Sequence, residues 1–133
     1  MSIDVQARYL QAQVQTATPE MLITMLYDGA LRFLRQARAQ IAGGKMSEAN
    51  ASLVRAEEII AELNGCLDME RGGEIAANLR LLYDYLLRRL VEANVKKDPQ
   101  IVEEVARFIG ELREVWVEAV RTVQGSLRSS QSV

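Results

Sequence analysis

The stretch MSEANASLVRAEEIIAELNGCL, residues 46–67, determines the fold class of this chain. Its apolar residues recur every three or four positions, which is the spacing of one face of an α-helix and not of a strand. They are Ala49, Leu53, Ala56, Ile60, Leu63 and Leu67. A single narrow stripe of this kind is typical of a helix that packs at a shallow angle against other helices. We therefore predict an all-α protein.

Three further segments show the same periodicity, and their starts carry clear signals. The predicted helices cover residues 18–42, 46–67, 73–97 and 98–124. Thr18-Pro19 and Asp98-Pro99 each supply a side-chain acceptor followed by proline. The acceptor can cap a helix, and proline at the first helical position lacks only an N–H that would be unpaired anyway. Two of the helices therefore begin at these dipeptides.

Glycine pairs separate the helices and set the topology. Gly43-Gly44 and Gly72-Gly73 mark breaks, because glycine readily adopts the left-handed conformation found at helix ends. Four helices of similar length with short connections bury their apolar stripes most simply as an antiparallel bundle. We predict an antiparallel four-helix bundle over residues 18–124, preceded by a cap segment with a short amphipathic helix, residues 1–17, and followed by a flexible polar tail, residues 125–133.

Each of the other helices is also assigned one core stripe from its periodicity. The first stripe is Leu22, Leu26, Ala30, Phe33, Ala37 and Ile41; the third is Ile75, Leu79, Leu82, Leu86 and Leu90; the last is Ile101, Val105, Phe108, Leu112, Val115 and Ala119. A bundle helix needs about three apolar positions per heptad, and these helices contain more.

The remaining apolar residues need an explanation. They are Met21, Ile23, Met25, Tyr27, Leu31 and Leu34 on the first helix, Leu81, Tyr83, Tyr85, Leu87 and Val91 on the third, and Val102, Ile109, Trp116 and Val120 on the last. One interpretation is a wide core with ordinary exposed apolar atoms. The other is a set of grooves that accept another chain. Met21 and Met25 suit such grooves, because the flexible thioether side chain repacks easily around a partner.

The composition leaves few groups for catalysis. The sequence has no histidine, so it lacks an imidazole base and a histidine-ligated metal, and its one cysteine, Cys66, allows no disulfide framework. Glu104, Glu111 and Glu118 share a helix face, but di-metal bundles also use histidine ligands. A net charge of -2 argues against nucleic-acid binding, and no segment suits a membrane span or signal peptide. We expect no enzyme, cofactor or metal.

Five short blocks, in this order and spacing, carry a resemblance to a known family. They are TATP (16–19), MLYDGA (25–30), GGEIAANL (72–79), LYDYLLRRL (82–90) and EAN (92–94). Each block alone is weak evidence, but together, over about residues 9–120, they resemble the FliS family of flagellin-specific export chaperones.

The resemblance implies a bundle with an N-terminal cap and a non-enzymatic role in the cytosol. Members of the family bind the disordered C-terminal region of new flagellin in apolar surface grooves. Binding prevents premature polymerisation and keeps flagellin competent for flagellar type III export, and export-gate components are a further class of partner. Tyr9 matches the family pattern near the N-terminus and is expected in the cap or at the partner. The predicted contact residues are Tyr9, Met21, Met25, Tyr27, Tyr83, Leu87 and Trp116.

One alternative from another class uses the same surplus apolar surface. A structural bundle could self-associate through it as a homodimer. The apparent mass of a homodimer changes on dilution, whereas that of a chaperone changes when a flagellin C-terminal peptide is added. A carboxylate-ligated metal enzyme is a weaker alternative, and it predicts bound iron or manganese in the purified protein.

Overall fold

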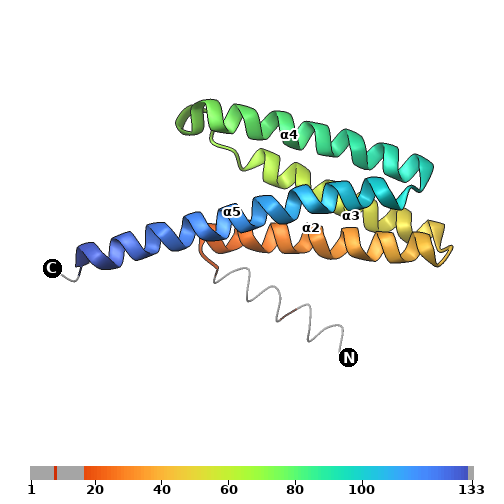
Figure 1. The fold of residues 1–133 in the computed structure, drawn as a ribbon, viewed down its shortest axis with the longest axis horizontal. Helices are drawn as coiled ribbons and strands as arrows, with labels where there is room; N and C mark the ends of the chain where they lie inside the picture. Colours follow the sequence, from red (N-terminus) through yellow and green to blue (C-terminus); the bar gives the residue numbers. More distant parts are fainter. Residues whose placement is uncertain (1–7, 9–16, 132–133) are drawn as a thin grey trace.

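Four long helices make up the protein. The computed structural model describes residue 8 and residues 17–131 (Figure 1). The helices are α2 (Pro19–Ala42), α3 (Met46–Gly65), α4 (Met69–Lys96) and α5 (Pro99–Gln131). The described residues contain no strand, which confirms the all-α prediction. Nearly all of the predicted cap segment, Tyr9 included, lies outside the described residues.

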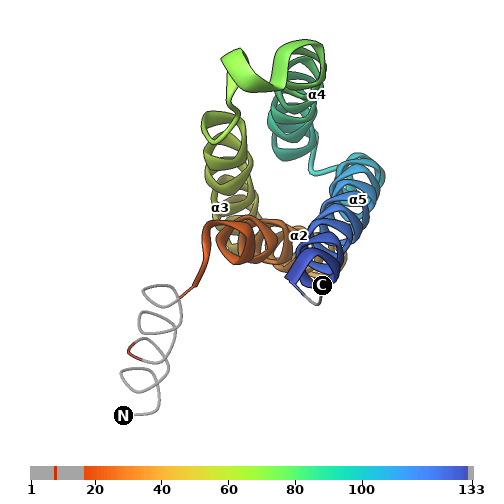
Figure 2. The ribbon, with the colours of Figure 1, turned by 90° about the vertical axis from the view of Figure 1, so that its left-hand side faces the viewer.

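The helices form an antiparallel bundle in which chain order is also the order around the bundle. Figure 2, which looks along the helices, shows α2, α3, α4 and α5 following one another in a ring. Helix α2 packs most extensively against α3 and α5, and α4 completes the ring with looser contacts to the same two helices. Connections of two or three residues force sequence neighbours to run in opposite directions. The predicted four-helix bundle is confirmed.

The helix starts follow from side-chain capping. The Thr18 hydroxyl accepts a hydrogen bond from the Met21 N–H at 3.2 Å, directly before Pro19, as the sequence predicts. Asp98 caps α5 in the same way and accepts from the Gln100 N–H at 2.9 Å. Each cap pairs one of the N–H groups that a helix start leaves without an intrahelical partner.

The start of α4 differs from the prediction. The helix begins at Met69 rather than at residue 73, because Asp68 provides a cap by accepting from the Arg71 N–H at 3.0 Å. The first turn then ends at Gly73, whose φ of 52° and ψ of -127° are not helical. That conformation is readily available only to glycine. The glycine pair thus produces a kink inside α4 and not the boundary between two helices.

The predicted end of the last helix at Gln124 is wrong, because α5 continues to Gln131. Gly125 lowers helix stability by only about 1 kcal/mol relative to alanine, which is too little to stop a helix without a capping arrangement. The extension projects past the start of α2 (Figure 1), and residues 121–129 are all exposed.

The core confirms the predicted stripe on α3 and shifts the stripes on its neighbours. Ala49, Leu53, Ala56, Ile60 and Leu63 are buried, and Leu67 packs against them. On α2 the predicted Ala30, Ala37 and Ile41 are buried. Tyr27, Leu31 and Leu34, which the sequence analysis placed outside the core, are buried too, whereas Leu22, Leu26 and Phe33 are only half-buried.

The stripes on α4 and α5 need similar corrections. Ile75 and Val115, both predicted in the core, are 73% and 69% exposed. Val102 and Ile109, predicted beside the seam, are fully buried. Each of these helices has two apolar faces of equal spacing, and periodicity does not distinguish them.

A pair of tyrosines joins two helices that lie diagonally across the bundle. The hydroxyls of Tyr27 on α2 and Tyr83 on α4 are 2.7 Å apart and hydrogen-bonded, and both side chains are buried. Burial raises the pKa of both tyrosines above the ordinary value, because the charged phenolate would lose its hydration. The pair satisfies two buried polar groups and fixes which faces of α2 and α4 point inward.

Several charged side chains form ion pairs on the surface. Glu104 on α5 accepts two hydrogen bonds from the Arg89 guanidinium, both at 3.1 Å, and one from the Tyr85 hydroxyl at 2.9 Å. These contacts hold the pKa of Glu104 below its usual value, with the Arg89 hydrogen bonds contributing most. Exposed pairs of this kind contribute little to stability and mainly set the register of α4 against α5. None of the helices in the described residues is long and apolar enough to cross a membrane.

Candidate partner-binding groove

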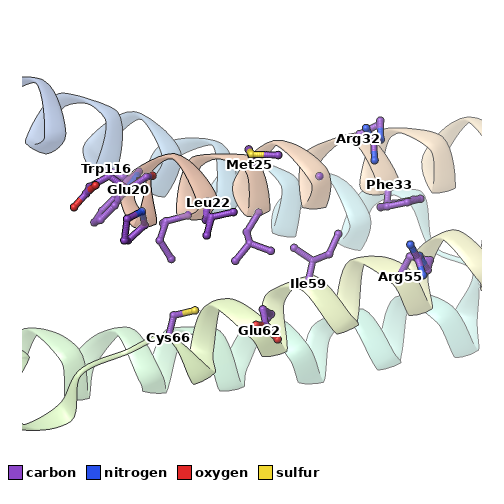
Figure 3. Close-up of a pocket in the computed structure, with 14 residues that line it drawn as sticks. Glu20, Leu22, Met25, Arg32, Phe33, Arg55, Ile59, Glu62, Cys66 and Trp116 are labelled. Carbon is purple, nitrogen blue, oxygen red and sulfur yellow. The ribbon is translucent and has the colours of Figure 1, made fainter. Parts of the chain in front are cut away.

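An apolar groove with a volume of about 880 Å³ runs along the outer side of the bundle between α2 and α3 (Figure 3). Its apolar lining comes mostly from α2, with one side chain from α3 and one from α5. These residues are Leu22, Ile23, Met25, Leu26, Phe33, Ile59 and Trp116. They are half-buried, so their outer surfaces are available to another molecule.

A glycine at the floor lets the two helices approach closely. Leu22, Leu26, Gly29 and Phe33 follow one another at intervals of four, three and four residues and so share one face of α2. A Cβ added at Gly29 would lie 3.3 Å from the Ile59 Cδ1 atom. A side chain at position 29 would require Ile59 to move by a few tenths of an ångström, so the glycine gives Ile59 room beside α2.

Trp116 closes one end of the groove. Its indole N–H donates to the Thr24 hydroxyl at 3.1 Å and to the Glu20 carbonyl at 3.2 Å, which ties α5 to the first turn of α2. The only polar atom of the ring is therefore bonded within the bundle. The rest of the ring is left as an apolar wall, a division of roles that suits tryptophan at binding surfaces.

The two ends of the groove carry opposite charges. The guanidinium carbons of Arg32 and Arg55 lie 5.1 and 5.5 Å from the centre of the Phe33 ring, one from each helix. Glu20 lies at the end where Trp116 lies, and Glu62 lies about midway along the α3 side, across from Met25 (Figure 3). Apart from Glu62, the side chains between these ends are mostly apolar, so the groove can bury apolar side chains of a partner while its ends meet charged groups.

Two of the predicted contact residues line this groove and one does not. Met25 and Trp116 are half-buried in its wall. Met21 is 52% exposed on α2 but does not contribute to the lining. Tyr9 lies outside the described residues.

The structure places the other three predicted contact residues elsewhere. Tyr27 and Tyr83 are 5% and 2% exposed and bond to each other in the core, so their side chains offer no surface to a partner. We therefore assign them to the core, a correction to the prediction. Leu87 on α4 packs against the core and is not part of the groove.

The sequence analysis assigned four groove residues otherwise. It placed Leu22, Leu26 and Phe33 in the core, and Ile59 in no class. The signal that could have identified this face is Gly29, because a glycine inside a helical stripe points to close approach by a neighbouring element. A helix face enclosed in the core does not require a glycine, because large side chains fill the space between it and its neighbours.

The arrangement suits binding and not chemistry. In the part of the chain that the structure describes, no three His, Cys, Asp or Glu side chains are placed to hold a metal ion. Glu20 and Glu62 lie apart on different helices, so the two carboxylates of the groove are not arranged as an acid–base pair (Figure 3).

Comparison with known proteins identifies the family of this chain. The family described as "Flagellar protein FliS" matches residues 1–123. The chain belongs to the FliS family. The flagellar secretion chaperone FliS of Bacillus subtilis is 40% identical over 114 residues, covering 86% of this chain and 84% of the relative. That of Salmonella typhimurium is 42% identical over 108 residues, covering 80% of each chain.

A third relative extends the comparison. The flagellar secretion chaperone FliSB of Pseudomonas aeruginosa is 40% identical over 107 residues, covering 80% of this chain and 85% of the relative. The resemblance seen in the sequence blocks is therefore confirmed. Membership of this family assigns the chain a chaperone role in flagellar secretion, and that role is not enzymatic.

Proposed function

We propose that this chaperone acts in the cytosol and holds the disordered C-terminal region of flagellin in the groove between α2 and α3. Holding this region prevents premature polymerisation and keeps the subunit competent for flagellar type III export. The observation that supports the proposal is the half-buried apolar lining of the groove, which is open to solvent although the bundle already has a complete core.

The length of the groove suits a short amphipathic helix. Its lining on α2 extends from Pro19 to Phe33, and a helix rises 1.5 Å per residue, so the groove is about 20 Å long. A partner helix of three to four turns would span that length. Such a helix would present its apolar residues at intervals of three and four, as is usual for a helix bound in a groove.

The apolar lining can supply useful affinity. About five buried anchors at roughly 1.5–3 kcal/mol each give on the order of 10 kcal/mol. Ordering a disordered segment costs about 2–5 kcal/mol, which leaves about 5–8 kcal/mol. That range corresponds to dissociation constants from roughly 0.2 mM to 1 µM. Binding of this strength is reversible, as export requires.

Occupation of the groove also explains how polymerisation would be blocked. A flagellin segment whose apolar face lies against α2 and α3 cannot use that face to pack against another flagellin subunit. Because the same residues serve either contact, release from the groove restores the ability to assemble.

Calorimetric titration with full-length and C-terminally truncated flagellin tests the proposal. We expect full-length flagellin to bind and the truncated form not to bind. In the chaperone, Met25→Asp should weaken binding by more than about 1.5 kcal/mol, because a carboxylate is costly to bury in an apolar groove. The matched control is Leu81→Asp, since Leu81 is 68% exposed on α4 and lies outside the groove.

The proposal is wrong if truncated flagellin binds as well as the full-length protein, or if both variants weaken binding equally. Circular dichroism checks that each variant remains helical. Sedimentation of the chaperone alone at several dilutions separates flagellin binding from self-association, because a homodimer would lose apparent mass without any flagellin present. Trp116 is the only tryptophan, so its fluorescence reports directly on the end of the groove.

A further inference from the structure

The charges at the ends of the groove come from both of its walls. Arg32 and Glu20 belong to α2, and Arg55 and Glu62 belong to α3. The two arginines lie at one end, Glu20 lies at the other, and Glu62 lies about midway along the α3 wall (Figure 3). The groove is therefore polarised along its length.

The arginines are available to a partner. Within residues 17–131, Arg32 has no ion pair, and Arg55 has only a loose one to Glu58 at 3.8 Å. Both guanidiniums stack near the Phe33 ring, which holds them beside the groove without neutralising them. The Glu20 and Glu62 carboxylates have no hydrogen bond or ion pair to the described residues either.

The helix dipoles of the walls do not offset this pattern. The positive N-terminus of α2 and the negative C-terminus of α3 lie at the same end of the groove, so their fields oppose each other. The side-chain charges therefore dominate the field that a bound segment meets.

We infer that the groove binds the flagellin helix in one direction, with its C-terminal, negatively charged end against Arg32 and Arg55 and its N-terminal end toward Glu20. This inference rests on the proposed function. A helix carries a partial negative charge at its C-terminus and a partial positive charge at its N-terminus, so only this direction is favourable at both ends. Acidic side chains in the last turn of the segment would strengthen the preference.

The native cysteine makes the direction measurable. Cys66 lies in the groove toward its acidic end, and it is the only cysteine in the sequence. A benzophenone attached to Cys66 should crosslink to the N-terminal half of a bound synthetic peptide from the flagellin C-terminal region. In a Cys66→Ser background, Ala51→Cys places the same probe one helical turn beyond Arg55, where it should crosslink to the C-terminal half. Mass spectrometry locates both crosslinks on the peptide.

The opposite pattern of crosslinks, or the same pattern from both probes, would overturn the inference while leaving the proposed function intact. A peptide that binds with full affinity but crosslinks to neither probe would overturn both, because it would lie outside the groove. These results separate the failure of the direction from the failure of the site.

Charge reversal provides an independent measurement. The double variant Arg32→Glu and Arg55→Glu should bind the peptide roughly five- to tenfold more weakly at low salt, and the difference should shrink as salt is added. The control Arg80→Glu and Arg88→Glu makes the same change in net charge at exposed positions on α4 and should leave affinity within about twofold. Equal losses in the two double variants would show that net charge alone is responsible and would overturn the inference.

Discussion

Removing either hydroxyl of the Tyr27–Tyr83 pair should cost more stability than removing both. The two oxygens are 2.7 Å apart in a core where the side chains are 5% and 2% exposed. Phenylalanine keeps the ring and so keeps the packing. Tyr27→Phe or Tyr83→Phe therefore changes one polar group and leaves the other buried without its partner.

The magnitude follows from that burial. An unsatisfied buried hydroxyl costs about 1–3 kcal/mol, whereas replacing both partners with apolar groups of the same shape is nearly neutral. We expect each single variant to lower the free energy of unfolding by about 1–2 kcal/mol and the double variant by less than either. The coupling energy of the cycle should then be at least about 1 kcal/mol, which is measurable for residues in contact.

Urea denaturation followed by circular dichroism at neutral pH supplies the four free energies. Tyr85→Phe is the control, because its hydroxyl bonds to Glu104 at the surface and its loss leaves no buried polar group unpaired. Its effect should be smaller than that of either core variant. Additive losses at the two core positions would refute the reasoning, since they would mean that each hydroxyl finds a partner without the other.

Three further predictions follow from local geometry. Because burial raises the pKa of the core tyrosines, they keep their protons above about pH 10 in the folded state and lose them in the unfolded state. The free energy of unfolding of the wild type should therefore fall above about pH 10, and that of the double phenylalanine variant should fall less, as measured by urea midpoints. Gly73→Ala should destabilise the folded protein by about 1 kcal/mol or more, because residue 73 has a positive φ. Gly110→Ala should stabilise it by about 0.5–1 kcal/mol, because a Cβ at this position in α5 would meet only open space. Thermal unfolding measures both changes. Because Arg89 lowers the pKa of Glu104, that carboxylate stabilises the fold above the pKa that it has in the unfolded chain. The difference in free energy of unfolding between wild type and Glu104→Gln should shrink in acid titrations as pH falls through the lowered pKa of the folded state.

The helices and their number could be predicted from the sequence because the signals are local. Thr18, Asp98 and the glycine pairs act within a few residues of themselves, so no knowledge of the rest of the fold is needed to interpret them. The core stripe of α3 was predicted correctly, because its apolar residues at helical spacing form one main stripe, although the helix ends at Gly65 and not at residue 67. Asp68 was missed as a cap because the glycine pair that follows it is the stronger signal.

The end of α5 shows a limit of periodicity. Its apolar seam continues through Val115 and Val123, yet both side chains are exposed, at 69% and 58%. For Val123 the reason is the length of the neighbouring helix: α2 begins at Pro19, so the last turns of α5 extend beyond any helix that could cover them. Val115 precedes Trp116, which still contacts α2, so its side chain is exposed because it lies on a side of α5 that α2 does not cover. The spacing of residues in one helix contains no information about where another helix stops.

The same limit explains why the groove was taken for core. On α2 the stripe through Leu22, Leu26 and Phe33 and the one through Tyr27 and Leu34 have the same helical spacing and differ by about one residue, a rotation of roughly 100°. Which of them points at the bundle axis depends on the partners across the core, and the bond from Tyr27 to Tyr83 gives the answer. The other stripe then faces outward along α3. A helix with one apolar face could only hold the bundle together, whereas the second face of α2 leaves an apolar surface for a partner without weakening the core.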